Sequence, residues 1–292
     1  NGTSTSTPKA TLAAALALAS CGDIIYVDKG TYIEENLSIA DNTDDISIIG
    51  AGNDKTIFDG DNTDDWLTFA SGGNTVNITI TDMTVKEYGG GVSQHGGAVR
   101  QLGGSGIIFQ DMIFESNRID YSTSSGGVYF ADNASSAEFD RCVFRSNYSG
   151  YHASVINWDA SGNLTMKNCL IYENTRDNNA EVYLQGSGTG NFYNCTFVDN
   201  SSSGGYGVIE AWSGDANIYN SIFYNNGSTY DPWDNAATAT TYYCMYDAAD
   251  GTQNNTVVGS PTFANAGSDD YRLKYGSTGI DAGDNSHVSG IS

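Results

Sequence analysis

The sequence predicts an all-β fold, a solenoid in which parallel β-strands stack in register. A nine-residue segment that ends in asparagine recurs five times between residues 109 and 226, and equivalent positions of the copies carry similar side chains. Helical periodicity is absent after residue 20, which argues against strands alternating with helices. A compact β-sandwich would not repeat its positions in this way. These observations together predict a parallel β-helix.

The asparagine at the end of each copy predicts a turn. Asparagine tolerates the left-handed backbone conformation, and stacked asparagine side chains can bond to one another along a ladder. At separations of 30, 27, 26 and 26 residues, the copies end at Asn117, Asn147, Asn174, Asn200 and Asn226. We expect these side chains to lie above one another in successive coils.

Two other positions of the repeat predict the interior, where stacked strands lie about 4.8 Å apart. Three residues before the asparagine stand Phe114, Phe144, Ile171, Phe197 and Phe223. Five residues before it, consecutive copies carry Cys142, Cys169 and Cys195. We interpret these thiols as small apolar filler, with metal binding or redox chemistry as the alternative. The five cysteines of the chain are odd in number and widely spaced, so no disulfide framework is expected.

The two ends of the chain depart from the repeat. The run Thr11–Ser20 is rich in alanine and leucine and predicts a helix that caps the stack, although together with Cys21 it also looks like a lipoprotein signal. We predict a cap-helix segment over residues 1–22 and coils over residues 23–238. Residues 239–292 should form an irregular or capping segment of the same domain.

Charge and hydropathy exclude two classes of partner. The formal net charge is −23, from 12 Lys and Arg against 35 Asp and Glu, so the surface repels nucleic acid and anionic lipid. No apolar run approaches the roughly 18 residues that cross a membrane. We expect neither nucleic-acid binding nor direct membrane insertion.

Three stretches carry a family resemblance. Residues 8–32, with Ile46–Gly52 and Thr56–Gly60, resemble the opening of pectin-lyase-like right-handed parallel β-helix proteins. The repeats resemble the parallel β-helix repeat family, and residues 260–274 and 279–284 resemble the closing segment of bacterial surface proteins of the "choice-of-anchor" type. The resemblance implies a right-handed β-helix that is secreted or displayed at the cell surface. It does not imply one activity, because such proteins include lyases, hydrolases, adhesins and structural proteins.

An acidic motif occurs twice and suggests a cation site. The motif Asp-Asn-Thr-Asp-Asp stands at residues 41–45 and again at 61–65, about one short coil later. If the two loops stack, their carboxylates repel one another, and Ca²⁺ would relieve the repulsion. The candidate ligands are Asp41, Asp44, Asp45, Asp59, Asp61, Asp64 and Asp65. The alternative is two solvated turns that point apart.

A second strand precedes each repeat, and its outward side chains are the candidate catalytic groups. We predict this outward column as Arg100, Phe130, Asn157, Leu184 and Glu210. Elimination of a uronate needs a base and a cation, and Arg100 is the only basic residue of the column. Asp132 and Asp159 are the best carboxylate pair for a hydrolase. His95 and His152 occupy equivalent places two coils apart, too far for one proton relay.

Aromatic residues offer a carbohydrate-binding alternative. Trp158 stands between Asn157 and Asp159, and Trp212 is a further platform for a sugar ring. The competing interpretation is a partly buried ring at a loop edge.

No set of catalytic residues converges in the sequence, so we favour a non-catalytic function. We expect an extracellular or cell-surface β-helix module with a structural or adhesive role, which assembles into a homo-oligomer or filament or binds surface polysaccharide. The alternative is a polysaccharide lyase or glycoside hydrolase that works in a groove on one face.

Overall fold

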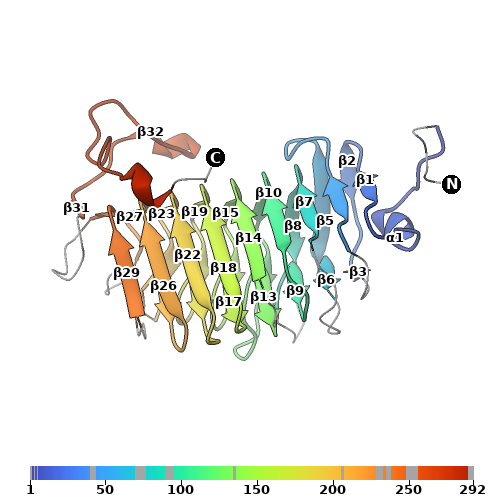
Figure 1. Ribbon diagram of the computed structural model, residues 1–292, viewed down its shortest axis with the longest axis horizontal. Coiled ribbons are helices and arrows are strands. Elements are labelled where there is room, and N and C mark those ends of the chain that lie inside the picture. Colours follow the sequence, from blue (N-terminus) through green and yellow to red (C-terminus); the bar gives the residue numbers. More distant parts are fainter. Residues whose placement is uncertain are drawn as a thin grey trace.

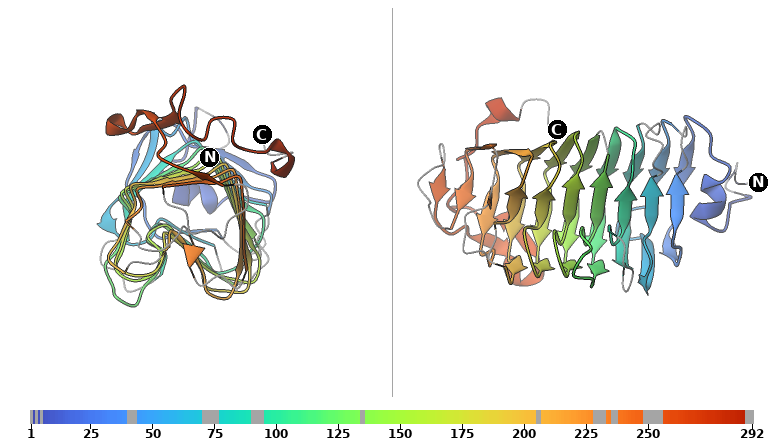
Figure 2. Two further views of the ribbon diagram at one scale, coloured as in Figure 1. Left: turned by 90° about the vertical axis from the view of Figure 1, so that its left-hand side faces the viewer. Right: turned by 90° about the horizontal axis from the view of Figure 1, so that it is seen from below.

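The computed structural model is an all-β parallel solenoid, as the repeats predict (Figure 1). It describes residues 2, 4, 6–39, 44–69, 77–89, 95–133, 136–204, 207–227, 233–234, 238–247 and 256–288. Within these residues no helix is long and apolar enough to span a membrane. Seen along the axis, the coils superpose on one outline (Figure 2).

Two long parallel sheets run along the solenoid. Sheet A contains, in spatial order, β1 (Ile24–Tyr26), β4 (Ser47–Ile49), β7 (Thr79–Thr81), β10 (Ile107–Gln110), β14 (Ser136–Asp140), β18 (Asn163–Lys167), β22 (Thr189–Tyr193), β26 (Asp215–Tyr219) and β29 (Thr238–Tyr242). Sheet B contains β2 (Gly30–Tyr32), β5 (Thr56–Thr63), β8 (Thr84–Tyr88), β11 (Ile113–Glu115), β15 (Val143–Arg145), β19 (Leu170–Tyr172), β23 (Thr196–Val198), β27 (Ile222–Tyr224), β30 (Met245–Tyr246) and β31 (Val257–Val258).

The third side of the coil is built from a long sheet and a short one. Sheet C contains β3 (Leu37–Ile39), β6 (Leu67–Phe69), β9 (Val99–Gln101), β13 (Tyr129–Asp132), β17 (Ile156–Asp159), β21 (Val182–Leu184), β25 (Ile209–Ala211) and β28 (Trp233–Asp234). A four-stranded sheet comprises β12 (Arg118–Ile119), β16 (Tyr148–Ser149), β20 (Thr175–Arg176) and β24 (Ser201–Ser202). Along the chain each of these short strands follows sheet B and precedes sheet C.

From the coil that begins with β7 onward, two corners of each described coil turn at a single left-handed residue. Between sheets A and B this residue is Asp82, Asp111, Arg141, Asn168, Asn194, Asn220 or Tyr243. Between sheet B and the four-stranded sheet it is Glu87, Ser116, Ser146, Glu173, Asp199 or Asn225, which directly precedes the ladder asparagine or its counterpart. We expected the ladder asparagine to be suited to this conformation, but its neighbour adopts it. A one-residue corner keeps the flanking strands in register from coil to coil.

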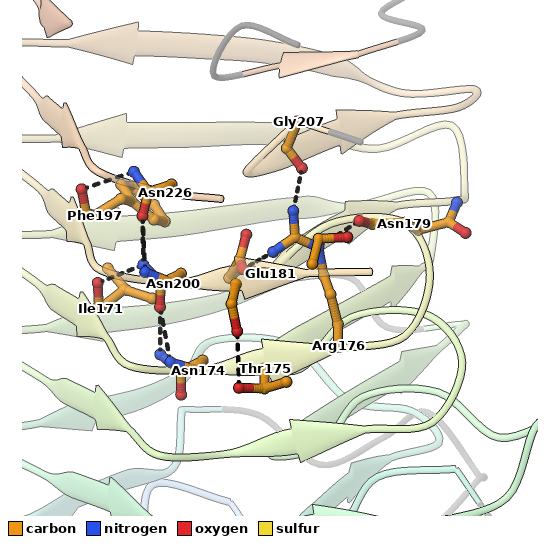
Figure 3. A network of polar contacts seen from close by, with 12 residues as sticks. Ile171, Asn174, Thr175, Arg176, Asn179, Glu181, Phe197, Asn200, Gly207 and Asn226 are labelled. Carbon is orange, nitrogen blue, oxygen red and sulfur yellow. Dashed lines mark hydrogen bonds and ion pairs between the residues drawn. The ribbon is translucent and has the colours of Figure 1, made fainter. Parts of the chain in front are cut away.

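The predicted asparagine ladder is present and buried. Asn147 Nδ2 donates to Asn174 Oδ1 at 2.9 Å, and Asn174 Nδ2 donates to Asn200 Oδ1 at 2.9 Å. The backbone N–H of Asn147 also donates to Asn174 Oδ1. Figure 3 shows this ladder from Asn174 to Asn226. Each amide therefore bonds the turns of two coils together.

Interior side chains stack as the columns predict. The rings of Phe114 and Phe144 lie 5.1 Å apart and those of Phe197 and Phe223 lie 4.8 Å apart, nearly parallel in both pairs. Cys142 and Cys169 are buried free thiols, and each donates to a backbone carbonyl of the preceding coil. The thiols thus fill space in the core.

A short helix lies at the N-terminal end of the stack (Figure 1). Helix α1 (Leu12–Leu16) begins after Thr11, whose hydroxyl accepts from Ala14 N, while Glu34 accepts from Leu12 N. Only Leu12 of this helix is buried, so α1 closes the core with one side chain. The helix spans five residues, fewer than the alanine-rich run.

The C-terminal segment doubles back over the outside of sheet B (Figure 2). Its antiparallel strands are β32 (Phe263–Asn265) and β33 (Asp270–Leu273). Tyr271 packs on Tyr172 and Val198, and its hydroxyl bonds to Asp199. Strands β29, β30 and β31 extend sheets A and B beyond residue 238, where we expected the coils to end.

Candidate functional site

The outward face of sheet C gathers most of the candidate catalytic residues. Backbone register places in one column the outward side chains Arg100, Phe130, Asn157, Tyr183 and Glu210. Two residues along the strand, Asp132 and Asp159 extend this face, because side chains of a strand alternate between its two sides. We call these seven residues the sheet C face.

One member of the predicted column was wrong. Leu184 points into the core, aligned with Trp158 and Ala211, and Tyr183 takes its outward place. The one-residue error arises because Glu181, and not Val182, aligns with Val155. A valine pattern fails to locate the strand where a buried glutamate replaces valine.

Asp132 and Asp159 form a carboxylate pair on adjacent strands. They are register partners, and parallel strands lie about 4.8 Å apart. Burial raises the pKa of Asp159, and the charge of Asp132 raises it further, while His95 opposes both effects. Asp159 therefore keeps its proton to higher pH than an ordinary aspartate.

Asn157 adds an unsatisfied acceptor beside the pair. The side chain is 1 % exposed, and its Oδ1 has no hydrogen-bond partner, while Nδ2 donates to Gln185 Oε1 at 3.4 Å. A buried acceptor without a donor costs about 1–3 kcal/mol.

The two predicted tryptophan platforms differ in placement. Trp158 is fully buried and its Nε1 donates to Gly162 O, so the expected carbohydrate contact of Trp158 is wrong. It alternates with Asn157 and Asp159 and therefore faces the core. Trp212 is 60 % exposed and follows β25, so its role in sugar binding stays a prediction.

The two acidic loops lie at different corners of the solenoid. Asp44 and Asp45 lie between sheet C and sheet A, whereas Asp64 and Asp65 lie between sheet B and sheet C. The expectation that the loops stack is therefore wrong. Among the described residues no group of three acidic, histidine or cysteine side chains could hold a metal ion.

The individual aspartates of these loops have protein partners. Asp59 pairs with Lys86 at 2.8 Å, Asp45 accepts from Asn77, and Asp65 is nearly buried and accepts from Thr68. Asp61 is exposed at the end of β5, and Asp41 lies outside the described residues. Calcium binding stays a prediction.

Glu210 of the sheet C face belongs to a buried polar network that the repeats do not predict. Arg176 and Glu181 form an ion pair, and both are almost completely buried. Asn179 Nδ2 donates to Glu210 Oε2 at 2.5 Å, and Asn179 Oδ1 contacts His152 Nδ1 at 2.5 Å. Figure 3 shows Arg176, Asn179 and Glu181 in this arrangement. The signal in the sequence is the glutamate that replaces a core valine.

The two predicted histidines lie along the same face, each stacked on an aromatic ring. His95 stacks on Phe130 at 4.6 Å, and His152 stacks on Tyr183 at 4.8 Å. Burial lowers the pKa of both imidazoles, and the charge of Arg100 lowers the pKa of His95 further. Both imidazoles are therefore more readily neutral than a solvated histidine.

Comparison with known families agrees with this architecture. The chain belongs to the right-handed β-helix family, whose model matches residues 114–290, more than half of the chain. Its first half is pectinesterase-like, because the pectinesterase family model matches residues 2–144. A search of curated proteins found no match.

Distant similarity to solved structures is also found. A pectin methylesterase from Yersinia enterocolitica is 10 % identical over 84 % of this chain and 94 % of its own, with a TM-score of 0.45. The ORF18 protein of Geobacillus virus E2 is 14 % identical over 80 % and 57 %, with a TM-score of 0.41. A mutant alginate lyase of the PL6 family is 11 % identical over 80 % and 36 %, with a TM-score of 0.41.

Proposed function

We propose that this chain is an exported protein that binds a polysaccharide along the sheet C face and hydrolyses an ester bond there. The observation that carries the proposal is the in-register pair of Asp132 and Asp159 beside the unsatisfied oxygen of Asn157. The match of the pectinesterase family model to the first half of the chain, including Asp132, supports an ester as the substrate.

The two carboxyl groups have separable roles in ester hydrolysis. Asp159, with its raised pKa, donates a proton to the oxygen of the departing alcohol. Asp132 accepts a proton from the water that attacks the carbonyl carbon. The C–O bond to the alcohol breaks, and the products are the alcohol and a carboxylic acid.

The placement of the pair favours an ester over a glycosidic bond that is cleaved with inversion. Asp132 and Asp159 lie on adjacent strands and extend from one face. Glycoside hydrolysis with inversion needs one carboxyl at the leaving oxygen and another on the opposite side of the ring. An ester carbonyl can be attacked and protonated from the same side.

The charge of the protein also fits an esterified substrate. With a formal net charge of −23, the surface repels a polysaccharide that already carries free carboxylates. Esterification masks those charges, so the substrate approaches more easily than the product. Elimination is less well supported, because Arg100 is the only basic residue of the outward column.

Asp159→Asn should reduce alcohol release from a methyl-esterified polyuronate by about 10²–10⁴-fold, the contribution of one general acid. Activity of the natural protein should fall as pH rises through the raised pKa of Asp159, because the acid form is consumed. The matched control is Asp120→Asn at an exposed ion pair. Full activity in Asp159→Asn, or no alcohol release by the natural protein, would refute the proposal, and unsaturated products would show a lyase instead.

A non-catalytic surface module is the second candidate, and the first coil favours it. Leu18, Ile24, Tyr26 and Ile33 are large apolar side chains that are 55–78 % exposed. Among the described strands, β1 pairs only with β4 and β2 only with β5, so this end presents unpaired strand edges. End-to-end assembly with a second copy would cover both features.

Assembly predicts concentration-dependent association that Tyr26→Lys and Ile33→Lys weaken. Charged side chains at a sheet edge oppose pairing with another chain. Sedimentation velocity over a wide concentration range measures the association, and Tyr121→Lys, at an exposed aromatic position in the middle of the solenoid, is the matched control. A natural protein that stays monomeric throughout would exclude this role.

A further inference from the structure

The buried network that includes Glu210 of the sheet C face fixes the orientation of the Asn179 amide. Glu210 is fully buried and Asn179 is 6 % exposed. The NH₂ group of Asn179 faces Glu210 and donates to its Oε2 at 2.5 Å, since an amide nitrogen only donates. The carbonyl oxygen of Asn179 then faces His152.

This amide orientation dictates the tautomer of His152. Asn179 Oδ1 lies 2.5 Å from His152 Nδ1, and an amide oxygen only accepts. His152 Nδ1 must therefore carry the proton and donate it. The lone pair of the neutral ring is left on Nε2, which becomes the only nitrogen of this imidazole that can accept a proton.

His95 provides an opposite case in the same chain. The backbone N–H of Ser125 donates to His95 Nδ1 at 2.9 Å, so the lone pair of His95 is on Nδ1 and is occupied. The proton of neutral His95 is then on Nε2. The two imidazoles lie along the same face but present opposite chemistry.

We propose that Nε2 of His152 is a hydrogen-bond acceptor for a hydroxyl group at the sheet C face. Glu210 sets this tautomer through Asn179. The half-buried imidazole is flanked by the rings of Tyr151 and Tyr183, and the charge of His95 also acts on it. Arg176 and Glu181 lie behind the relay, and the Arg176 side chain bonds to the backbone oxygen of Asn179. Asn179 and Glu210 are positioning residues.

The ligand that this acceptor fits carries hydroxyl groups, as a sugar does. The acceptor Nε2 of His152 and the aromatic rings that flank it form a surface for a polyol or sugar. This choice of ligand rests on the proposed function, whereas the tautomer of His152 does not.

Nitrogen-15 NMR of the histidine side chains tests the relay without any substrate. His152 should show a protonated Nδ1 and an unprotonated Nε2, and His95 should show the reverse. Asn179→Ala should lower the pKa of His152 further, because the hydrogen bond that opposes the effect of burial is gone. It should also shift the tautomer ratio by about fivefold, the value of one ordinary hydrogen bond. Protonated Nε2 in neutral His152 would overturn the proposal, as would an unchanged ratio in Asn179→Ala.

Two features keep this test interpretable. Alanine is tolerated at this left-handed backbone position, since Ala153 adopts it in the preceding coil. Glu210→Gln preserves shape but lets the amide of Asn179 reverse, so it too should lose the fixed tautomer. If Glu210→Gln leaves the ratio unchanged, Glu210 has no part in the relay.

Chemical reactivity gives an independent readout. Diethyl pyrocarbonate acylates an imidazole nitrogen that has a free lone pair, so peptide mapping should find His152 modified faster than His95. Asn179→Ala should slow modification of His152 at Nε2, by less than the roughly fivefold change in tautomer ratio. Equal rates at His152 and His95 would overturn the proposal.

The ligand class has its own test. Adding methyl-esterified uronate oligosaccharide should move the Nε2 resonance of His152 in the natural protein. If the oligosaccharide binds and this resonance does not move, the contact between sugar and His152 is refuted. If the oligosaccharide does not bind, the proposed function fails while the tautomer result stands.

Discussion

Arg176→Ile should lower the free energy of unfolding by about 3–5 kcal/mol, the usual cost of removing one partner of a buried ion pair. Isoleucine is the residue at the equivalent position two coils earlier, Ile119, so shape alone does not forbid it. The loss arises because Glu181 and Glu210 are both fully buried and would lose their cation. Urea unfolding followed by far-UV circular dichroism measures the change.

The pH dependence of this variant identifies the cause. Without Arg176, burial raises the pKa of the two glutamates above their unfolded values, so stability is lost as pH rises through the folded pKa. The variant should therefore be closer to the natural protein at pH 5 than at pH 8. A cost under about 1 kcal/mol at pH 8, the value of an exposed ion pair, would contradict the expectation.

Two further variants test whether burial of the ion pair causes the loss of stability in Arg176→Ile. Arg118→Met removes an exposed ion pair with Asp120 and should cost less than about 1 kcal/mol. The double variant Arg176→Ile with Glu181→Val removes both charges of the pair, and valine fills the equivalent places at Val155 and Val208. We expect it to be more stable than Arg176→Ile alone, because apolar replacement of a whole buried pair is often neutral.

Asn174→Leu should cost about 4–6 kcal/mol, since it breaks the middle of the asparagine ladder. Asn174 Oδ1 accepts from the backbone and the side chain of Asn147, and its Nδ2 donates to Asn200 and to Phe144 O. All of these groups are buried, and each one left unsatisfied costs about 1–3 kcal/mol. Thermal and urea unfolding measure the loss.

The end of the ladder supplies the matched control. Asn226 is only partly buried, and its Nδ2 donates to Phe197 O while its Oδ1 accepts from Asn200. Water can replace partners there, so Asn226→Leu should cost about half as much as Asn174→Leu. Equal losses would mean that the ladder is not cooperative along its length.

The repeating part of the fold could be predicted from the sequence because stacking makes neighbouring coils demand the same residue. Phe114 and Phe144 meet face to face, so the column identity is itself the contact. The left-handed corners were harder to predict from the sequence, because Arg141, Ser146 and Glu173 all adopt that conformation and share no chemical type. There the backbone geometry is imposed by the neighbouring coils and not by the residue.

The candidate site was only half visible in the sequence. Asp132 and Asp159 could be paired because both follow regular strands, and the outward side of Asn157 followed from alternation. The same alternation turns Trp158 into the core, whereas its polar neighbours Asn157 and Asp159 suggested a ring at the surface. Asn179 could not be placed, because the segment between the four-stranded sheet and sheet C varies in length between coils.

The varying length of the segment before sheet C indicates where the chain can accept insertions. In the coils that begin with β10, β14, β18 and β22, two residues join sheet A to sheet B and two join sheet B to the four-stranded sheet. Nine residues lie between β12 and β13, but five between β20 and β21. The frame thus tolerates insertion almost solely beside the sheet C face. Mutation can therefore remodel the edge of the sheet C face coil by coil, while the two-residue corners of these four coils keep their strands in register.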